Sequence, residues 1–360
     1  MRLPVSFKRL WCLAFAALLL PACVKDKPDD PVLPPPAGGR MLYIANEGSL
    51  GNGNASLSLY HLEEGTVYND VFGQKNGQPL GDILQSLLVD GDRLFLAVNN
   101  SDKIVIADKK DAAMKGSITV RKPRYMLKTG PEKMYVSSLY YPEINIINPE
   151  TQQVTGKIEI DYPNSEGMTL LNGKVYVCNW DTACNYLYEI DPATDVITAR
   201  IPLAGRAAQQ VLSDRNGKLW VLAGNVYKQK QATLTQIDPL SRGIIRSFVF
   251  PAGADVMKPC WNPGKDTLYF LGVDYDGGTG YNGVYRMSIE ADALPAQPFI
   301  PAQPLQYFWA LGVDPLTNRI YVGDPKGFIQ KGSIGVYQTN GQKISSFDTG
   351  LGPAFFWFEP

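Results

Sequence analysis

A short apolar segment with an aromatic residue at its second or third position recurs along the chain. The first copy is residues 41–45 (MLYIA), and the last is residues 320–323 (IYVG). Short apolar runs bounded by turn residues are typical of buried β-strands. Seven aromatic residues mark the copies at intervals of 52, 40, 41, 44, 49 and 52 residues: Tyr43, Phe95, Tyr135, Tyr176, Trp220, Tyr269 and Tyr321.

Each apolar strand lies in the same local order. A preceding strand ends in a turn such as 171–174 (LNGK), where Asn-Gly favours a hairpin. An Asx-Pro turn such as 148–151 (NPET) leads into a fourth strand, for example 156–160. Four strands in every unit, with no helix between units, predict an all-β fold, a seven-bladed β-propeller. The third strands alternate in polarity and are expected at 56–62, 103–107, 143–148, 186–191, 233–238, 283–288 and 333–337.

The two ends of the chain are expected to close the ring. Residues 24–40 contain no inner strand for the first blade, whereas residues 352–358 (GPAFFWF) form an apolar strand without a following partner. Pairing of this last segment with the first strand completes seven blades and covers the otherwise open inner edge of the first blade. The predicted propeller therefore spans residues 41–360.

The N-terminal segment is expected to direct export. Residues 1–22 combine a basic start with an apolar core that is too short to span a membrane, as in a signal peptide. The residues before Cys23 resemble the lipobox of bacterial lipoproteins, which implies lipidation at Cys23; the alternative is an ordinary secretory signal. Residues 23–40 then form a proline-rich tether. Its acidic residues resemble a surface-export signal, so we expect an outer-membrane lipid anchor at the cell surface, or otherwise on the periplasmic side.

Charge and histidine content bear on the chemistry. The chain has 34 basic and 35 acidic residues, so nothing in its charge indicates a nucleic-acid partner. Its single histidine, His61, is expected to face solvent on an outer strand, and a Ser-His-Asp relay is therefore not expected. No metal site or cofactor is predicted. Cys178 and Cys184 flank a short connection, where a disulfide and two buried free thiols are both open.

Several segments resemble known propellers. The Asx-Pro-x-Thr turns resemble those of YncE-like (YVTN-repeat) propellers. More narrowly, residues 42–49 (LYIANEGS), 81–86 (GDILQS) and 98–101 (VNNS) resemble a group of Bacteroidetes propeller lipoproteins. The resemblance spans roughly residues 41–358. Some members of this group lie beside an outer-membrane transporter and capture cobalamin, while others have no assigned ligand. The resemblance implies the fold and makes a corrinoid the first candidate ligand.

One face of the propeller is expected to carry the binding site. The loops between second and third strands and the entries of the inner strands meet there, around the central channel. Aromatic rings and fixed amides together suit a broad amphipathic ligand, although aromatics such as Trp309 can instead fill the channel wall. The residues predicted to bind ligand are Asn46, Asp82, Gln85, Asn99, Arg124, Tyr125, Tyr140, Tyr141, Glu166, Asn179, Trp180, Arg206, Gln209, Tyr227, Lys258, Trp261, Tyr275 and Trp309.

Three functional hypotheses follow. The first is a non-catalytic lipoprotein that captures a ligand, with a corrinoid as candidate, for a TonB-dependent transporter of the outer membrane. The second is a protein–protein interaction scaffold or lid of an envelope or transporter complex. The third is a propeller lyase or glycosidase that uses a pair of carboxylates, and the candidates for that pair are Glu47, Asp82, Glu166, Asp274 and Asp324.

Overall fold

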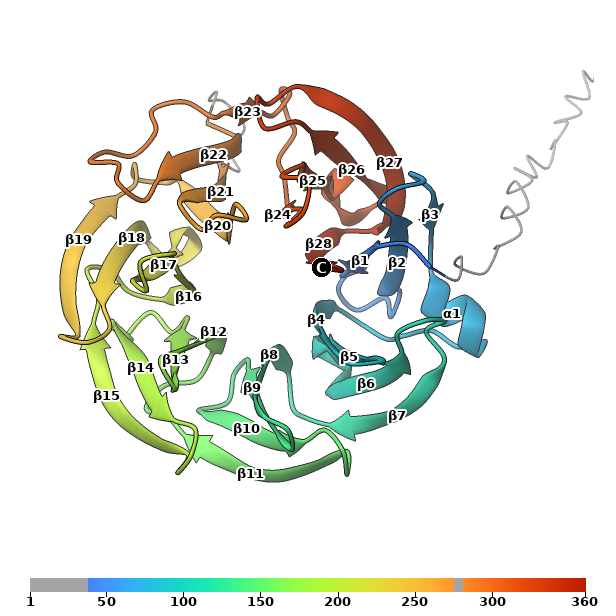
Figure 1. The fold of residues 1–360 in the computed structure, drawn as a ribbon, viewed down its shortest axis with the longest axis horizontal. Coiled ribbons are helices and arrows are strands. Elements are labelled where there is room, and N and C mark those ends of the chain that lie inside the picture. The colour runs from blue at the N-terminus through green and yellow to red at the C-terminus, as the bar shows by residue number, and fades with distance from the viewer. Residues whose placement is uncertain (1–37, 275–280) are drawn as a thin grey trace, which may run out of the picture. The chain divides into compact units, whose positions relative to one another are not determined.

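The computed structural model describes residues 38–274 and 281–360. Tyr275, one of the predicted site residues, lies outside these ranges, as do the predicted signal peptide and Cys23. These described residues form one compact unit. In this unit seven antiparallel sheets of four strands surround a common centre, as a seven-bladed β-propeller does (Figure 1). The predicted fold class is confirmed.

The blades follow one another along the chain, and in each blade the strands run from the centre outwards. Blade 1 contains β28 (Pro353–Phe358), β1 (Met41–Asn46), β2 (Ser56–His61) and β3 (Val67–Tyr68). Blade 2 contains β4 (Leu84–Asp90), β5 (Arg93–Val98), β6 (Lys103–Asp108) and β7 (Met114–Thr119). Blade 3 contains β8 (Pro123–Gly130), β9 (Lys133–Ser138), β10 (Glu143–Asn148) and β11 (Gln153–Glu159). Blade 4 contains β12 (Ser165–Leu171), β13 (Lys174–Asn179), β14 (Tyr186–Asp191) and β15 (Val196–Pro202).

The remaining three blades complete the ring. Blade 5 contains β16 (Ala208–Ser213), β17 (Leu219–Asn225), β18 (Lys230–Asp238) and β19 (Gly243–Val249). Blade 6 contains β20 (Asp255–Trp261), β21 (Thr267–Val273), β22 (Gly283–Ser288) and β23 (Ile300–Pro301). Blade 7 contains β24 (Ala310–Val313), β25 (Ile320–Asp324), β26 (Lys331–Tyr337) and β27 (Lys343–Leu351). Three short 3₁₀ turns follow second strands: η1 (Asn99–Ser101), η2 (Val226–Lys228) and η3 (Lys326–Phe328).

The core lies between neighbouring blades. Each second strand is a nearly continuous buried run, as in β1 and β17, because both of its faces meet another blade. One cluster joins Phe95 and Ile104 of blade 2 to Met134 and Val136 of blade 3. Outer strands such as β15 alternate between exposed and covered positions. The marker aromatics identified in the sequence therefore belong to the packing between blades.

The first and last strands pair, as predicted. Tyr43 of β1 stands opposite Trp357 of β28, and their rings meet edge to face with centroids 5.4 Å apart. Arg40, just before β1, donates a hydrogen bond to Asp314 at 2.7 Å and another to the carbonyl oxygen of Glu359 at 2.8 Å. The ring is thus closed by strand pairing and by an ion pair between the first and seventh blades.

One helix corrects the prediction that no helix lies among the repeats. Helix α1 (Val71–Asn76) connects β3 to blade 2, where Phe72 is buried against the core. Asp70 accepts a hydrogen bond from the Gly73 amide, and Gly77 ends the helix in the left-handed conformation. These cap residues stand in the sequence, but a six-residue helix leaves no long periodic pattern.

A second correction concerns His61, which is buried and does not face solvent. The Glu64 amide donates to Nδ1 at 3.0 Å, and Nε2 lies 3.2 Å from the Gly38 carbonyl oxygen. In this arrangement Nδ1 accepts a hydrogen bond and Nε2 faces a carbonyl acceptor. Cys178 and Cys184 are both buried free thiols, so of the two open alternatives the structure has the unbridged one.

Candidate ligand-binding site

Five consecutive inner strands bulge at the end nearest one face. In β4, Leu84 pairs with Val98 and Ser86 pairs with Ala97, which leaves Gln85 as the extra residue. Gln209 of β16 is left over in the same way. A bulge re-aims the side chain that it frees from the ladder. The corresponding shifts in β8, β12 and β20 fall at Arg124–Tyr125, at Glu166–Gly167 and at Lys258–Pro259.

Blades 1 and 7 contribute from positions next to their strands. Glu47 follows β1, and its amide donates to the carbonyl oxygen of Gly352 at 2.8 Å. Gly48 has φ 81°, and a Cβ there would meet the Ala55 nitrogen at 2.7 Å, so the loop that fixes Glu47 needs a glycine. Trp309 precedes β24, and its amide donates to the Gly323 carbonyl oxygen at 2.8 Å.

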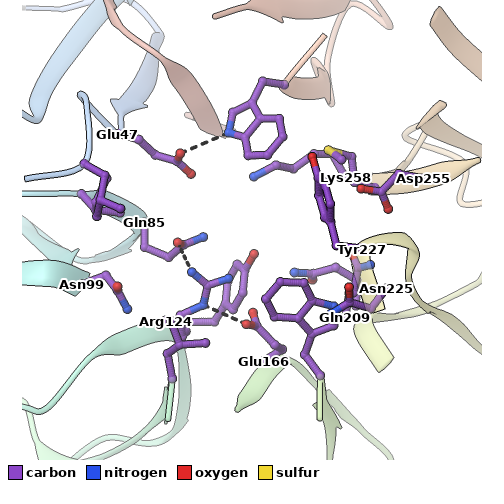
Figure 2. A pocket seen from close by; sticks show the side chains of 18 of the residues that line it. Glu47, Gln85, Asn99, Arg124, Glu166, Gln209, Asn225, Tyr227, Asp255 and Lys258 are labelled. Carbon is purple, nitrogen blue, oxygen red and sulfur yellow. Dashed lines mark hydrogen bonds and ion pairs between the residues drawn. The ribbon is translucent and has the colours of Figure 1, made fainter. Parts of the chain in front are cut away.

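These side chains meet in one cavity of about 400 Å³ (Figure 2). Every blade supplies at least one residue to it, and the polar groups stand among aromatic and aliphatic ones. The lining consists of Glu47, Leu50, Ile83, Gln85, Asn99, Asn100, Arg124, Tyr125, Leu139, Tyr140, Glu166, Trp180, Gln209, Gln210, Asn225, Val226, Tyr227, Asp255, Met257, Lys258 and Trp309.

One ion pair in the cavity is closed. The Arg124 Nε donates to Glu166 Oε1 at 2.9 Å, and Nη1 of the same guanidinium donates to Gln85 Oε1. Burial raises the pKa of the Glu166 carboxyl, although the charge of Arg124 opposes the shift. Three neighbouring blades are therefore joined through one arginine.

A second pair of opposite charges stands apart. Trp309 Nε1 donates to Glu47 Oε2 at 3.1 Å, and Lys258 Nζ lies 5.8 Å from the centroid of the same indole. Lys258 makes no hydrogen bond or ion pair with any residue in the two described ranges. Burial raises the pKa of Glu47 and lowers the pKa of Lys258, and in each case the other group's charge opposes the shift.

The rim of the cavity combines one fixed aromatic ring with three exposed apolar side chains. Trp180 Nε1 and Gln209 Nε2 both donate to the Gly224 carbonyl oxygen, at 3.1 and 2.8 Å, which holds the indole in place. Leu50, Tyr140 and Tyr227 are 74%, 68% and 70% exposed. Exposed apolar groups around a concave polar site are typical of surfaces that cover a ligand.

Residues 40–359 match a protein family described as "Domain of unknown function (DUF5074)". The chain belongs to this family. No curated protein matches the chain. The match covers all seven blades of the DUF5074 chain and therefore includes every residue that lines the cavity.

Solved structures share the fold of this DUF5074 chain at low sequence identity. A quinoprotein alcohol dehydrogenase-like protein from Bacteroides thetaiotaomicron is 16% identical with a TM-score of 0.66, over 89% of this chain and 78% of that one. The dihydro-heme d1 dehydrogenase NirN is 10% identical (TM-score 0.56; 88% and 74% covered). A chain of the mitotic checkpoint complex is 12% identical (TM-score 0.59; 78% and 82%). Because these proteins differ in kind, the likeness shows the propeller fold alone.

Eleven of the predicted site residues line the cavity in the DUF5074 structure. The bulged positions account for six of them, and the others come from loops after second strands or from the start of blade 7. They are Gln85, Asn99, Arg124, Tyr125, Tyr140, Glu166, Trp180, Gln209, Tyr227, Lys258 and Trp309.

Three predicted polar residues instead hold the backbone or neighbouring side chains. Asn46 donates to Ser58 Oγ at 2.8 Å within blade 1. Asn179 donates to the Tyr162 carbonyl oxygen at 2.9 Å. Asp82 accepts from the Gly51 amide at 2.9 Å. A short polar side chain at a strand end satisfies local backbone groups as readily as it faces a cavity.

Three further predicted residues also lie outside the cavity lining. Tyr141 packs under the Arg121 guanidinium, 3.9 Å from its ring centroid. Arg206 donates to the Ala183 carbonyl oxygen at 2.7 Å. Trp261 packs against Trp220 of blade 5, with ring centroids 6.2 Å apart.

The sequence prediction left several lining residues out of the binding site. Glu47 is among the candidate carboxylates but not among the residues predicted to bind ligand, although it stands directly after an apolar strand, as Asn99 does. Asp255 and Met257 lie before the bulge of β20. Neither the acidic Asp255 nor the apolar Met257 carries a sequence signal for ligand binding. Within residues 38–274 and 281–360, no group of three or more potential metal ligands gathers.

Proposed function

We propose that this chain is a non-catalytic binding protein that holds a small amphipathic molecule in the cavity at the centre of the propeller. One observation carries the proposal: all seven blades direct side chains into a single cavity of about 400 Å³, and five of them do so through a bulge at the same place. Cavities of roughly 300–1,000 Å³ with an apolar wall and a few fixed polar groups are typical of small-molecule sites.

The polar groups support binding over chemistry. Arg124 already neutralises Glu166, and Trp309 already donates to Glu47. His61 is hydrogen-bonded to the Gly38 carbonyl oxygen and does not line the cavity. The propeller fold itself is consistent with a non-catalytic ligand-binding or interaction role.

A corrinoid remains a candidate ligand because of the sequence resemblance to cobalamin-capturing propellers. The exposed rings of Tyr140 and Tyr227 and the amides of Asn99 and Asn225 suit a broad ligand with amide side chains. The cavity lies at the lower end of the usual range, so such a ligand would rest on the rim and insert only one substituent.

We propose that a lipid on Cys23 anchors the chain to the outer membrane, and that the tether presents the cavity to a TonB-dependent transporter. The charged, proline-rich residues 24–39 support an extended spacer. In the part of the chain that the structure describes, no helix is both long and apolar enough to cross a bilayer.

The test is ligand retention by the mature lipidated chain in detergent. The protein is incubated with a cell extract, washed, and examined for bound molecules by native mass spectrometry, and cyanocobalamin is titrated separately by calorimetry. We expect a retained molecule that the Trp180→Ala variant loses, because the fixed indole wall is gone. Leu240→Ala, on a distant exposed turn, is the control. Equal retention by the wild type and the Trp180 variant would place the ligand elsewhere and refute the proposal.

A second candidate function has one observation in its favour. Burial raises the pKa of both Glu47 and Glu166, and a general acid at neutral pH needs such a shift. Glycoside hydrolysis or elimination is therefore tested by incubating the chain with glycans and separating the products. Turnover that both Glu47→Gln and Glu166→Gln abolish would establish this candidate; no product from any glycan would remove it.

A further inference from the structure

The cavity contains two pairs of opposite charges in different arrangements. Arg124 and Glu166 form a closed pair, with Nε 2.9 Å from Oε1. Lys258 and Glu47 form an open pair, because no ion pair joins them. The closed pair needs nothing further, whereas the open pair offers one donor and one acceptor to whatever enters the cavity.

Trp309 fixes the positions of both groups in the open pair. The edge of its indole donates from Nε1 to Glu47 Oε2 at 3.1 Å, and the face of the ring lies 5.8 Å from Lys258 Nζ. Figure 2 shows the Glu47 carboxylate and the Lys258 ammonium extending into the cavity from neighbouring parts of its wall. The two charges are therefore held beside one ring without touching each other.

The backbone also supports the position of Lys258. The residue lies at the bulge of β20 with φ 53°, in the left-handed region that a lysine rarely adopts. In a regular strand the side chain would point to one of the two faces of the sheet, towards a neighbouring blade. Strained backbone of this kind is often found where a side chain must point into a site.

An open pair is costly in a confined site. Each charge loses solvation, and neither recovers it through a direct contact with the other. The pKa directions agree, since burial favours the neutral form of Glu47 and of Lys258. A molecule that brings an anion to Lys258 and a cation to Glu47 would compensate both groups at once.

We infer that the natural ligand is a small zwitterion, an aminocarboxylate whose carboxylate binds Lys258 and whose ammonium group binds Glu47. The inference rests on the proposed binding function. Tyr125, Trp180 and Met257 line the same cavity and would contact the apolar part of the ligand. A volume of about 400 Å³ admits an amino acid or a dipeptide.

Calorimetry with matched probes tests the class of ligand. The mature chain in detergent is titrated with the twenty common amino acids and a set of dipeptides, and the tightest binder is compared with two analogues. One analogue lacks the carboxylate, as 2-phenylethylamine does relative to phenylalanine, and the other lacks the amine, as 3-phenylpropanoate does. We expect each analogue to bind at least about ten-fold more weakly, since each loses a charge-assisted hydrogen bond.

Two variants assign the two ends of the ligand. Lys258→Met is expected to bind the aminocarboxylate and its decarboxylated analogue equally. Glu47→Gln is expected to bind the aminocarboxylate and its deaminated analogue equally. Lys343→Met and Glu290→Gln, both exposed and distant, are the controls and should keep the wild-type preference. Thermal unfolding of each variant confirms that it is folded before it is titrated.

Three results would overturn the inference. The first is a wild-type protein that binds the deaminated analogue as tightly as the aminocarboxylate. The second is the absence of binding by any probe at millimolar concentration. The third is a molecule retained from cell extract, and lost in Trp180→Ala, that lacks an amino or a carboxyl group. In the third case the binding function stands and only the ligand class falls, so the two failures are distinguishable.

Discussion

Arg124 of blade 3 reaches across to Glu166 of blade 4, and the two side chains meet with Nε 2.9 Å from Oε1. The Glu166 side chain is 3% exposed and that of Arg124 is 17% exposed, so the pair is shielded from solvent. Gln85 of blade 2 accepts a further hydrogen bond from the same guanidinium. One arginine therefore holds together the inner ends of three blades and gives the cavity a rigid wall.

Removal of the arginine alone should destabilise the fold. Arg124→Met leaves Glu166 buried without a cation, which costs about 3–5 kcal/mol when a buried pair is broken. The double variant with Glu166→Gln should recover most of this loss, because no charge is left uncompensated. Urea unfolding followed by tryptophan fluorescence measures both free energies. If the single variant is as stable as the double variant, the buried Glu166 carboxylate does not depend on Arg124 for compensation of its charge.

Replacement of the open pair, Glu47 and Lys258, should instead stabilise the fold. Burial raises the pKa of Glu47 and lowers that of Lys258, so at neutral pH both charged forms cost stability in the folded state. The double variant Glu47→Gln with Lys258→Met should therefore unfold at a higher temperature than the wild type, with a gain of about 1–4 kcal/mol.

Measurement against pH checks the mechanism of that gain. For a carboxyl with a raised folded pKa, stability falls as pH rises from the ordinary pKa of glutamate through the raised value. For a lysine with a lowered folded pKa, stability is lost as pH falls through the lowered value. The gain of the double variant should thus be largest at neutral pH, and a gain that does not vary with pH would argue for simple repacking.

The strands could be predicted from the sequence because their signals are local. The third strands of blades 3, 4 and 6 have the predicted bounds, 143–148, 186–191 and 283–288. Turn residues and alternating polarity fix such segments before any long-range contact is considered. Helix α1 was missed because its six residues carry only cap signals, and those resemble turn residues.

The site could be predicted only in part, since its geometry depends on strand register. The sequence places Gln85 and Gln209 at the entries of inner strands, but pairing with β5 and β17 decides that both are bulged into the cavity. Asn46, the last residue of β1, and Asn99, the first residue after β5, are both predicted from the sequence to bind ligand. Asn99 lines the cavity, whereas Asn46 bonds to Ser58 inside blade 1.

The cap of helix α1 gives a third prediction. Asp70 accepts from the Gly73 amide at 3.2 Å and has φ 49°, in the left-handed region that Asp and Asn tolerate better than alanine does. Asp70→Ala should cost about 1–2 kcal/mol, since it loses both the cap and the tolerated conformation. Asp70→Asn retains both and should cost much less. Thermal unfolding compares the two variants, and equal losses would mean that the cap does not stabilise this connection.

Closure of the ring gives the last prediction, which concerns the stability of the fold at low pH. Arg40 donates to Asp314 at 2.7 Å, and Asp314 is almost fully buried. Burial alone would raise the pKa of Asp314, but hydrogen bonds from Arg40 and Thr317 hold it below its ordinary value. A depressed folded pKa contributes stability that is present above the ordinary pKa of aspartate and is lost as pH falls through the depressed value.

Arg40→Met should therefore lower the unfolding temperature at neutral pH. It should also weaken the further loss of stability that occurs as the pH falls below the ordinary pKa of aspartate. The cost should be about 3 kcal/mol, because Asp314 stays buried without its cation and the first blade loses one of its links to the seventh. Lys343→Met, on an exposed outer strand of blade 7, is the matched control and should leave the pH profile unchanged. If Arg40→Met and Lys343→Met give the same acid profile, strand pairing between β1 and β28 closes the ring without help from the ion pair.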